Sequence, residues 1–385
     1  MKQGNKNIFF WANYYIQHPD IGTTAKISAE IKTLRRLGFS VTYTAYLDDG
    51  VAIYDNNDSI VLKDDTVSCI GVIRKYKKRM KLIRISTEYV KKNIFDYCLL
   101  RINEFSPSYI NMLKWMKLHS FVMMESLSYY PNMNLLEVKS YIYNLIIASI
   151  KWNKNKLKDY IDLMLTEGCI DDFYGIPCVE FGMGVDVNCY TPHQYLGEKN
   201  EINMIMVGCN AIYHGVDRII CSLIEYYKGP SIPMIIKLHL VGDLNPSDAK
   251  LIKSPLLKGK CFVYGRKYGE ELDRIYNKCN LALGPLAQHR MRKKDTGLKT
   301  KEYFARGIPY IYSGEEVSIG KEYPYIMKVE DSEEIIQMKQ VVDFMITVCN
   351  NDGTVETMRQ KAKDVFSWDK IFNNVFRKVE QLKSS

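Results

Sequence analysis

The chain has 385 residues, of which 46% are hydrophobic and 25% are charged, a composition typical of a globular protein and not of a disordered or fibrous one. This length is sufficient for two domains of ordinary size, each with its own core. Fifty-three Lys and Arg against 44 Asp and Glu give a net charge of +9, which favours anionic partners. Because the basic residues are dispersed and no recognised binding module occurs, no nucleic-acid partner is expected.

Three further features concern the cellular compartment. The ten cysteines are scattered without a Cys-x-x-Cys pair, which favours reduced thiols in the cytosol over a disulfide framework. The first six residues are polar, and Asn13 and Gln17 interrupt the apolar run that begins at Ile8, so no signal peptide is expected. The longest apolar stretch, residues 141–150, is far shorter than the roughly 20 residues that span a bilayer. A cytoplasmic protein is expected.

A basic segment, residues 151–158, follows that apolar stretch. Residues 138–160 therefore allow two interpretations. They could form a helix packed in a core and ending in solvated lysines. They could instead contact an anionic membrane, which would place the protein at the inner face of the cell membrane.

In chain order, apolar strand patterns are expected at residues 8–12, 41–46, 96–102 and 121–125, and helices at 24–37 and 106–117. This alternation predicts an α/β fold with a parallel, doubly wound sheet. Ligands collect at the carboxyl ends of parallel strands, so the loop 13–24 should face a cleft between domains. Glycines, a proline and polar residues place the domain boundary near residues 180–200.

The segment 296–313 is the most informative part of the sequence. Thr296 is expected to cap a helix that ends at Gly307, Pro309 prevents its continuation, and Tyr310 begins a strand. Lys299 in the first turn would add positive charge to a helix N-terminus, which already suits a diphosphate. Glu302, about one turn later, could accept hydrogen bonds from the ribose hydroxyls. The alternative is an ordinary helix–strand unit with two solvated charges.

The residues Leu298-Lys-Thr-Lys-Glu-Tyr-Phe-Ala-Arg-Gly-Ile-Pro309 resemble the nucleotide-sugar motif of glycosyltransferase family 4 (group 1), an enzyme group of the GT-B fold, and in particular its bacterial surface-polysaccharide members. Segments 174–186, 204–220, 237–243, 262–276 and 366–370 are similar to other parts of the family. The resemblance implies two Rossmann-like doubly wound domains facing across a cleft. It implies an acceptor-binding domain at 1–185, a nucleotide-sugar-binding domain at 186–365, and a C-terminal helix, 366–385, that packs back on the first domain.

The same resemblance implies a retaining glycosyltransferase that moves a sugar from a nucleotide diphosphate sugar to a surface-polysaccharide or lipid-linked acceptor. No metal or other cofactor is expected, since no Asp-x-Asp motif or His/Cys cluster is evident. Protein cations and backbone N–H groups would stabilise the leaving diphosphate. The expected catalytic residues are Lys299, Glu302, Arg290 and Asp295. The expected donor-binding residues are Gly22, Gly208, Asn210, His214, Gly215, Arg266, Gly297, Leu298, Lys299 and Glu302.

The chain departs from the family at three positions. Cys209 and His214 replace an Arg and a Lys that many relatives direct at the phosphates, and Lys294 replaces the first Glu of a paired-glutamate motif. Asp295 is adjacent to Lys294 and could replace that acid. These differences leave the donor sugar open and allow two alternatives: a catalytically impaired nucleotide-sugar-binding or scaffold subunit, and a sugar-nucleotide epimerase of the same fold.

An inverting mechanism would need a general base in the first domain. Asp20, Glu104 and Glu125 are the candidate acids for this role. Arg101, at the end of the preceding predicted strand, is placed like Glu125, and both are candidates for lining the cleft.

Overall fold

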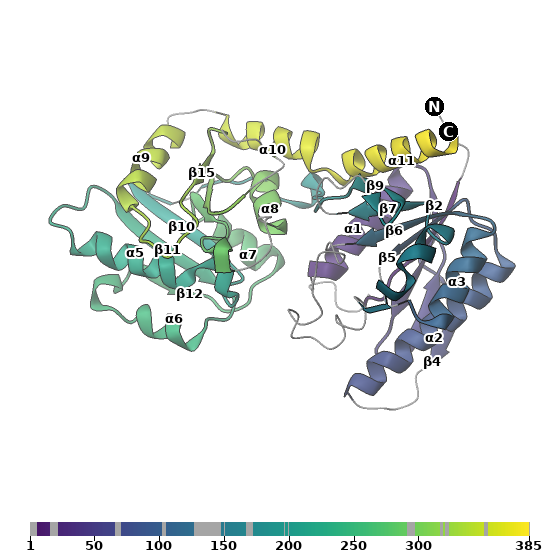
Figure 1. Cartoon of the computed structure of the whole chain (residues 1–385). Helices are drawn as coiled ribbons and strands as arrows, with labels where there is room; N and C mark the ends of the chain where they lie inside the picture. Colours follow the sequence, from purple (N-terminus) through teal and green to yellow (C-terminus); the bar gives the residue numbers. More distant parts are fainter. Residues whose placement is uncertain are drawn as a thin grey trace. The chain divides into compact units, whose positions relative to one another are not determined.

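A computed structural model describes residues 6–15, 22–65, 71–101, 105–126, 148–149, 151–166, 172–195, 197–198, 200–290, 297–315, 319, 323–349 and 353–384, with only the backbone at 22, 23, 71–73 and 75. The chain divides into two compact units (Figure 1). The N-terminal unit consists of Met1–Gly182 together with Trp368–Ser385, and the C-terminal unit of Met183–Ser367.

The N-terminal unit is built on a nine-stranded sheet in the order β4-β3-β2-β1-β5-β6-β7-β9-β8. Its strands are β1 (Asn7–Trp11), β2 (Ser40–Tyr46), β3 (Gly50–Tyr54), β4 (Ile60–Asp65), β5 (Tyr97–Arg101), β6 (Phe121–Ser126), β7 (Leu163–Thr166), β8 (Asp172–Phe173) and β9 (Ile176–Glu180). The run from β2 to β9 is parallel, as predicted, but β3, β4 and β8 are antiparallel to their neighbours. The order of the parallel strands reverses between β1 and β5, so ligand sites are expected at that point.

Helices cover both faces of this sheet: α1 (Gly22–Arg36), α2 (Gly71–Lys92), α3 (Pro107–Lys117) and α11 (Trp368–Ser384), with a short 3-10 helix, η3 (Lys154–Asp159). Successive residues of a strand point to opposite faces. Accordingly, Phe9 and Trp11 join a core with α2 and α3, whereas Ile8 and Phe10 join a second core with α1 and α11. Both faces of β1 are therefore buried, which explains its continuous apolar sequence.

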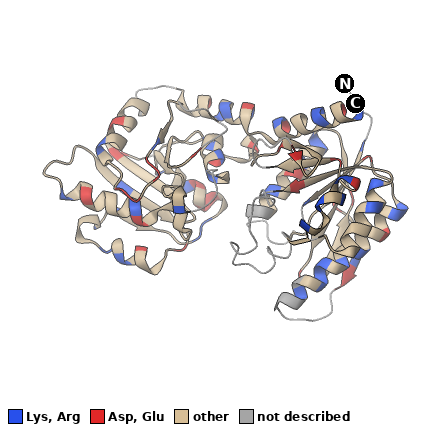
Figure 2. Ribbon diagram, in the orientation of Figure 1, with Lys and Arg blue, Asp and Glu red and all other residues tan. Residues whose placement is uncertain are grey.

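Three elements of this unit, β3, β4 and α2, were not predicted from the sequence. β4 alternates between exposed and half-buried residues at the edge of the sheet and has no apolar face to mark it. In α2 the sequence is dominated by basic residues, and lysines and arginines follow one another along this helix (Figure 2). Leu82, Ile83 and Ile85 of α2 are nevertheless buried in the core.

The C-terminal unit has a six-stranded, fully parallel sheet in the order β12-β11-β10-β13-β14-β15. Its strands are β10 (Glu201–Val207), β11 (Ile235–Val241), β12 (Cys261–Val263), β13 (Leu281–Leu283), β14 (Tyr310–Tyr312) and β15 (Ile326–Lys328). Numbered from β10, this is the order 3-2-1-4-5-6 of dinucleotide-binding domains, and its switch point lies between β10 and β13.

The helices of this unit are α5 (Val216–Lys228), α6 (Pro246–Leu251), α7 (Gly269–Tyr276), α8 (Leu298–Arg306), α9 (Met338–Cys349) and α10 (Thr354–Val365). The described part of this unit also contains the short 3-10 helices η4 (Val187–Cys189), η5 (Ile212–His214), η6 (Pro255–Leu257) and η7 (Gln288–Arg290). One core lies between the sheet and α5 and α9, and another between the sheet and α7, α8 and α10. The unit is therefore doubly wound, as predicted.

After α10 the chain leaves the C-terminal unit and forms α11, which packs in the N-terminal unit. Trp368, Phe372 and Val375 of α11 belong to the same core as Ile8 and Phe10 of β1. The expected return of the C-terminal helix to the first domain is confirmed. In the part of the chain that the structure describes, no helix has both the length and the apolar character needed to span a bilayer.

Candidate functional site

The turn after β10, at the switch point of the C-terminal sheet, approaches the helix that carries Lys299. Gly208 has φ +75°, and a Cβ at this position would lie 2.8 Å from Lys299 Nζ. Any larger residue would therefore be strained and would displace the ammonium group. The glycine turn after β10 and the first turn of α8 are therefore in contact with each other.

The described groups that contact the Lys299 ammonium directly are polar but uncharged. Its Nζ is 2.9 Å from His214 Nε2 and 3.4 Å from the carbonyl oxygen of Gly208. Burial lowers the pKa of His214 to about 3, so His214 is neutral and accepts from Lys299. No carboxylate lies within ion-pair distance of Lys299 among the described side chains. Burial also lowers the pKa of Lys299, to about 8.

An ammonium group held in this way is suited to an anion. It is partly buried, which strengthens its interaction with charge, and none of the described acids neutralises it. The N-terminus of α8, which begins at Leu298, adds further partial positive charge. Gly297 is the N-cap with φ +74°, so the expected cap at Thr296 is wrong by one residue.

Glu302 lies one turn after Lys299 on α8 and is partly buried. Its Oε1 accepts a hydrogen bond of 3.0 Å from the hydroxyl of Tyr190, which follows η4. Burial raises the pKa of Glu302, and the Tyr190 hydrogen bond opposes this rise. Tyr190 was not identified from the sequence, because nothing in its neighbourhood indicates a contact 112 positions away.

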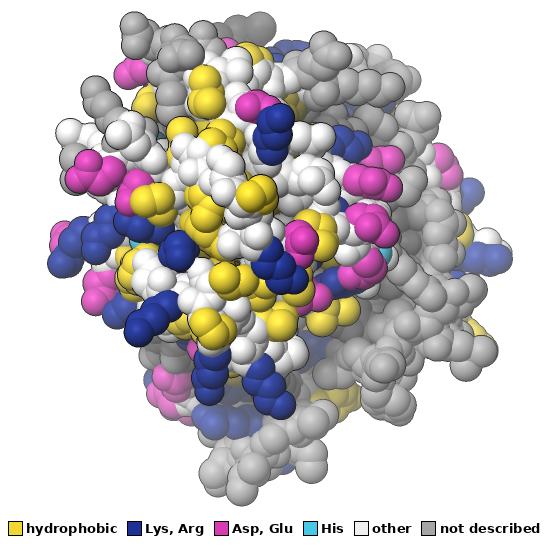
Figure 3. Space-filling model, turned by 90° about the vertical axis from the view of Figure 1, so that its left-hand side faces the viewer, with side chains coloured by type: hydrophobic (Ala, Val, Ile, Leu, Met, Phe, Trp, Pro, Cys, Tyr) yellow, Lys and Arg dark blue, Asp and Glu magenta, His cyan; other side chains and the backbone are white. Residues whose placement is uncertain are grey.

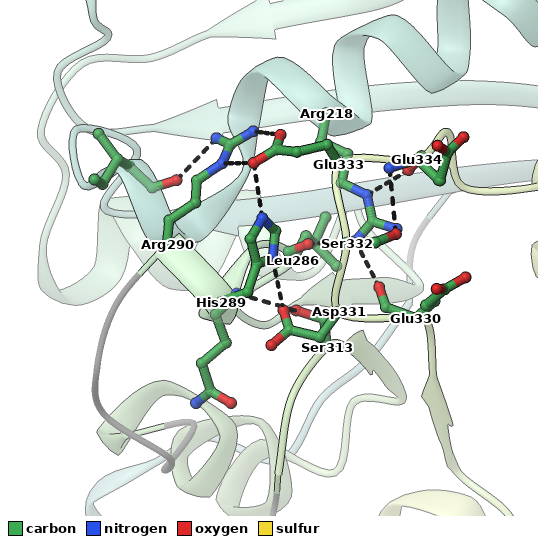
Figure 4. A network of polar contacts seen from close by, with 12 residues as sticks. Arg218, Leu286, His289, Arg290, Ser313, Glu330, Asp331, Ser332, Glu333 and Glu334 are labelled. Carbon is green, nitrogen blue, oxygen red and sulfur yellow. Dashed lines mark hydrogen bonds and ion pairs between the residues drawn. The ribbon is translucent and has the colours of Figure 1, made fainter.

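Arg290 and His289 lie on η7, in the loop after β13, and both are engaged by acids (Figure 4). Arg290 forms a bidentate ion pair with Asp217 at 2.8 and 2.9 Å and also pairs with Glu333. His289 contacts Asp331 at 3.1 Å and Glu333 at 2.7 Å, and hydrogen bonding to Glu333 is the main cause of its raised pKa. Asp217 and Glu333 thus offset the positive charge of Arg290, which was expected to face the diphosphate.

The same network includes Arg218 of α5, which the sequence analysis missed. Its guanidinium group is buried and donates to the backbone oxygens of Leu286, Glu330 and Glu334 (Figure 4). These carbonyls belong to the loops after β13 and β15, at the edge of the sheet where ligands are expected. Arg218 therefore holds the loops after β13 and β15 together at this edge of the sheet.

The remaining predicted donor-binding residues have varied positions. Asn210 is exposed in the turn after β10, and Gly215 is the left-handed N-cap of α5. Arg266 lies after β12 and pairs with Asp243 on an exposed surface. Gly22 is the first residue of α1. Asp295, together with Lys294, Asp20 and Glu104, lies outside the described residues.

Cys209, the first departure from the family, is completely buried beneath the glycine turn. Its Sγ lies 3.4 Å from the backbone oxygen of Val241, and burial raises the pKa of its thiol to about 12. Cys209 therefore fills the core and brings no charge to the site. His214, in contrast, is in direct contact with Lys299.

The N-terminal unit has a buried cluster of charges near its own switch point. Arg101 ends β5 and donates to Glu125 of β6, with Nε 2.8 Å from Oε2. Lys26 of α1 pairs with Glu125 and lies 3.2 Å from Glu30. The Lys26 ammonium also lies 5.3 Å from the ring of Phe181 and 5.6 Å from that of Trp368. The structure thus brings Arg101 and Glu125 together, as two members of a cluster of four ionisable side chains.

Two grooves occur away from these residues. One of about 590 Å³ lies between α5 and α9, and one of about 480 Å³ lies between α2 and α3. Figure 3 shows the face of the C-terminal unit that is on the left in Figure 1. On this face, apolar side chains gather between Lys and Arg side chains. None of the predicted site residues lines either groove.

Among the described residues, no group of His, Cys, Asp and Glu is arranged to hold a metal ion.

No protein-family model matches the chain, and no curated protein matches it. Solved structures share its fold. A glycosyltransferase from Rickettsia africae ESF-5 aligns with a TM-score of 0.66 at 13% identity, over 99% of both chains. Sucrose-phosphate synthase from Thermosynechococcus elongatus aligns with a TM-score of 0.63 at 14% identity, over 99% of this chain and 100% of that one. A protein described as UDP-N-acetylglucosamine 2-epimerase, from Listeria monocytogenes, aligns with a TM-score of 0.55 at 10% identity, over 99% and 98%.

These similarities agree with the two doubly wound units and the returning C-terminal helix. The chain has the GT-B fold, as the sequence predicted, and the fold is shared with glycosyltransferases.

Proposed function

We propose that the protein is a retaining glycosyltransferase that transfers a sugar from a nucleotide diphosphate sugar to a surface-polysaccharide or lipid-linked acceptor. The observation that carries this proposal is the Lys299 ammonium, which lies against the glycine turn at the switch point with no acidic partner among the described residues. A diphosphate is the anion that this position in a doubly wound sheet suits best.

In this proposal Lys299 and the N-terminus of α8 stabilise the charge on the leaving diphosphate. The bond between the sugar C1 and the diphosphate oxygen breaks, and a bond between C1 and the acceptor oxygen forms on the same face. The acceptor proton passes to a phosphate oxygen, so no protein nucleophile is required. Glu302 holds the ribose, and the network of Arg290 and Arg218 fixes the surrounding loops.

Support for a nucleotide-sugar donor also comes from the structural relatives. Two of them bear the names of a glycosyltransferase and a sucrose-phosphate synthase, and the third bears that of an enzyme of UDP-N-acetylglucosamine. Since the epimerase shares the fold as well, the reaction must be tested directly.

Contact with an anionic membrane is a further part of the proposal. Trp152 is 90% exposed and is flanked by Lys151 and Lys154, a combination suited to the interface of a bilayer. Cosedimentation with vesicles containing anionic lipid should be weakened in Trp152→Ala. Equal sedimentation of the two proteins would remove this part of the proposal.

The central test is a calorimetric titration with UDP-, GDP-, ADP- and CDP-sugars, followed by assays for nucleoside diphosphate release with and without glycan acceptors. Transfer to an acceptor supports the proposal, whereas interconversion of the sugar without an acceptor indicates an epimerase. Binding without turnover would indicate a scaffold subunit.

Lys299 provides the test of the site. Lys299→Ala should weaken nucleoside diphosphate binding by roughly 10- to 100-fold, the effect of losing a charge-assisted contact. Because the pKa of Lys299 is about 8, wild-type affinity should fall as the pH rises above about 8, where the ammonium loses its proton. Lys299→Arg should remove this fall, since Arg does not titrate there. Unchanged affinity in Lys299→Ala would refute the assignment.

A further inference from the structure

Tyr190 contacts the carboxylate that the proposed function assigns to the ribose. Its hydroxyl lies 3.0 Å from Glu302 Oε1. Burial is the main cause of a raised Tyr190 pKa, and the negative charge of Glu302 raises it further. The hydroxyl therefore keeps its proton and acts as the donor in this hydrogen bond.

Tyr190 is itself held firmly. Its backbone oxygen accepts from Arg359 Nη1 of α10 at 3.0 Å, and Arg359 also donates to the backbone oxygen of Ala305 in α8. The guanidinium of Arg306 lies 5.2 Å from the Tyr190 ring, and Asp273 holds Arg306 through an ion pair of 2.7 Å. A donor anchored in this way restricts the orientation of the carboxylate it contacts.

We propose that Tyr190 is a positioning residue of the nucleotide site, whose hydroxyl holds Glu302 Oε1 so that Oε2 is presented to one ribose hydroxyl of a nucleoside diphosphate. This inference rests on the proposed function. It changes the expectation from the sequence, in which Glu302 would accept hydrogen bonds from both hydroxyls of the ribose. One of those oxygens already has a protein donor.

Among the described groups, Tyr190, Arg306 from the next turn of α8 and Lys299 from the preceding turn favour the ionised Glu302 carboxylate and oppose the effect of burial. The hydroxyls of Tyr276 on α7 and Tyr303 on α8 also interact with this carboxylate, whose charge raises the pKa of both. Loss of the Tyr190 hydroxyl would therefore raise the pKa of Glu302 further. Nucleotide binding needs an ionised carboxylate that accepts a hydrogen bond. As the pH is lowered, binding to the variant would therefore weaken at a higher pH than binding to the wild type.

The test uses Tyr190→Phe in the full chain, which keeps the ring and removes the hydroxyl. UDP, GDP, ADP and CDP are first titrated into the wild type, and the diphosphate with the lowest Kd is used with its 2′-deoxy and 3′-deoxy analogues. Tyr190→Phe should raise the Kd of the ribose form by about tenfold. The KM of the matching donor should rise similarly, with kcat changed by less than about twofold.

The analogues test the geometry itself. In the wild type, one analogue should bind about tenfold more weakly than the other, because one ribose hydroxyl alone reaches Glu302. In Tyr190→Phe the difference should shrink to about threefold or less, since the carboxylate can then rotate. The acid limb of the pH dependence of Kd should move to higher pH.

Two further variants separate positioning from general damage. Tyr226→Phe loses a hydroxyl that donates to Met234 elsewhere in the same unit, and it should leave the Kd unchanged. Glu302→Gln alters the acceptor, so the added effect of Tyr190→Phe in that background should be much smaller than in the wild type. Thermal melting confirms that each variant is folded.

An unaltered Kd, analogue difference and acid limb in Tyr190→Phe would overturn the inference while the proposed function remains. Failure of the wild type to bind any of the four nucleoside diphosphates would instead refute the proposed function, and the inference with it.

Discussion

Three cations were expected to contact the nucleotide diphosphate sugar, and their surroundings in the structure differ. Lys299 contacts a neutral histidine and a backbone oxygen, whereas Arg290 pairs with Asp217 and Glu333 and Arg266 pairs with Asp243. The acidic partners of Arg290 lie 73 and 43 positions away in the sequence. A local sequence pattern therefore cannot show that, among the described residues, Lys299 is the cation of these three without an acidic partner. For this reason Lys299 is the one of the three that we propose as the phosphate ligand.

The N-terminal unit contains an acid in an unusual environment. Glu30 is completely buried, and burial raises its pKa to about 7, although Lys26 lies 3.2 Å away and opposes the rise. Between its unfolded pKa of 4.5 and the raised value, the folded chain binds a proton that the unfolded chain releases. This acid therefore lowers the free energy of unfolding as the pH rises from about 4.5 to about 7.

Glu30→Gln should accordingly stabilise the N-terminal unit at pH 8, by about 1 to 3 kcal/mol, because the amide needs no proton to be neutral. At pH 5 the gain should be much smaller, since Glu30 is then protonated in the folded chain. Urea unfolding at both pH values measures the difference. Glu88→Gln, at an exposed position on α2, is the control and should show no such dependence. A gain that is equal at pH 5 and pH 8 would contradict the assigned ionisation.

At the scale of the elements, the unit α8–β14 follows from local sequence. Gly307 ends the helix with φ +79°, and Pro309 leads into the strand, both as predicted. Other elements were missed because their local pattern is weak, as at β4, or because basic residues dominate, as in α2. Secondary-structure propensity and turn chemistry depend on a few neighbouring residues. Elements that are stabilised by packing against distant parts of the chain therefore cannot be predicted from them.

Gly307 is also the point where α8 approaches α10. A Cβ at this position would lie 2.7 Å from Val355 Cα, a backbone atom that cannot move aside easily. Gly307→Ala should therefore lower the free energy of unfolding of the C-terminal unit by more than about 3 kcal/mol, combining left-handed strain with overpacking. Thermal or urea unfolding measures this loss.

Gly353→Ala is the matched control for Gly307→Ala. Gly353 has a similar φ of +83°, but a Cβ there would meet nothing within 4 Å. The control should cost only the left-handed strain, about 1 to 2 kcal/mol. Equal losses in the two variants would show that the contact with Val355 has no effect.

At the scale of the whole molecule, the chain enters the C-terminal unit once and returns to the N-terminal unit in α11. The side chains of Trp368, Phe372 and Val375 complete a core that begins at β1, more than 350 residues earlier by the printed numbering. The N-terminal unit therefore cannot bury this face until the last segment of the chain is present.

Phe372→Ala tests this dependence. Phe372 is 1% exposed, and its ring centroid lies 5.5 Å from that of Phe181, so truncation should destabilise the N-terminal unit by about 3 to 5 kcal/mol. Hydrogen exchange followed by mass spectrometry should show faster exchange in peptides of residues 6–181, with little change in residues 200–290. Asn374→Ala, at an exposed position of the same helix, should change neither. Equal loss of protection in both units would contradict the assignment of α11 to the first.

The sequence alone was sufficient for the alternation of strands and helices, the helix that carries Lys299 and Glu302, and its resemblance to a GT-B motif, because hydrophobic period, caps and turns are local properties. The tertiary structure decided which charges remain available and which are offset. It placed Tyr190 on Glu302, Asp217 on Arg290, and His214 on Lys299. These contacts join segments about 70 to 110 positions apart, and their energies depend on distance and burial, which only the folded chain defines.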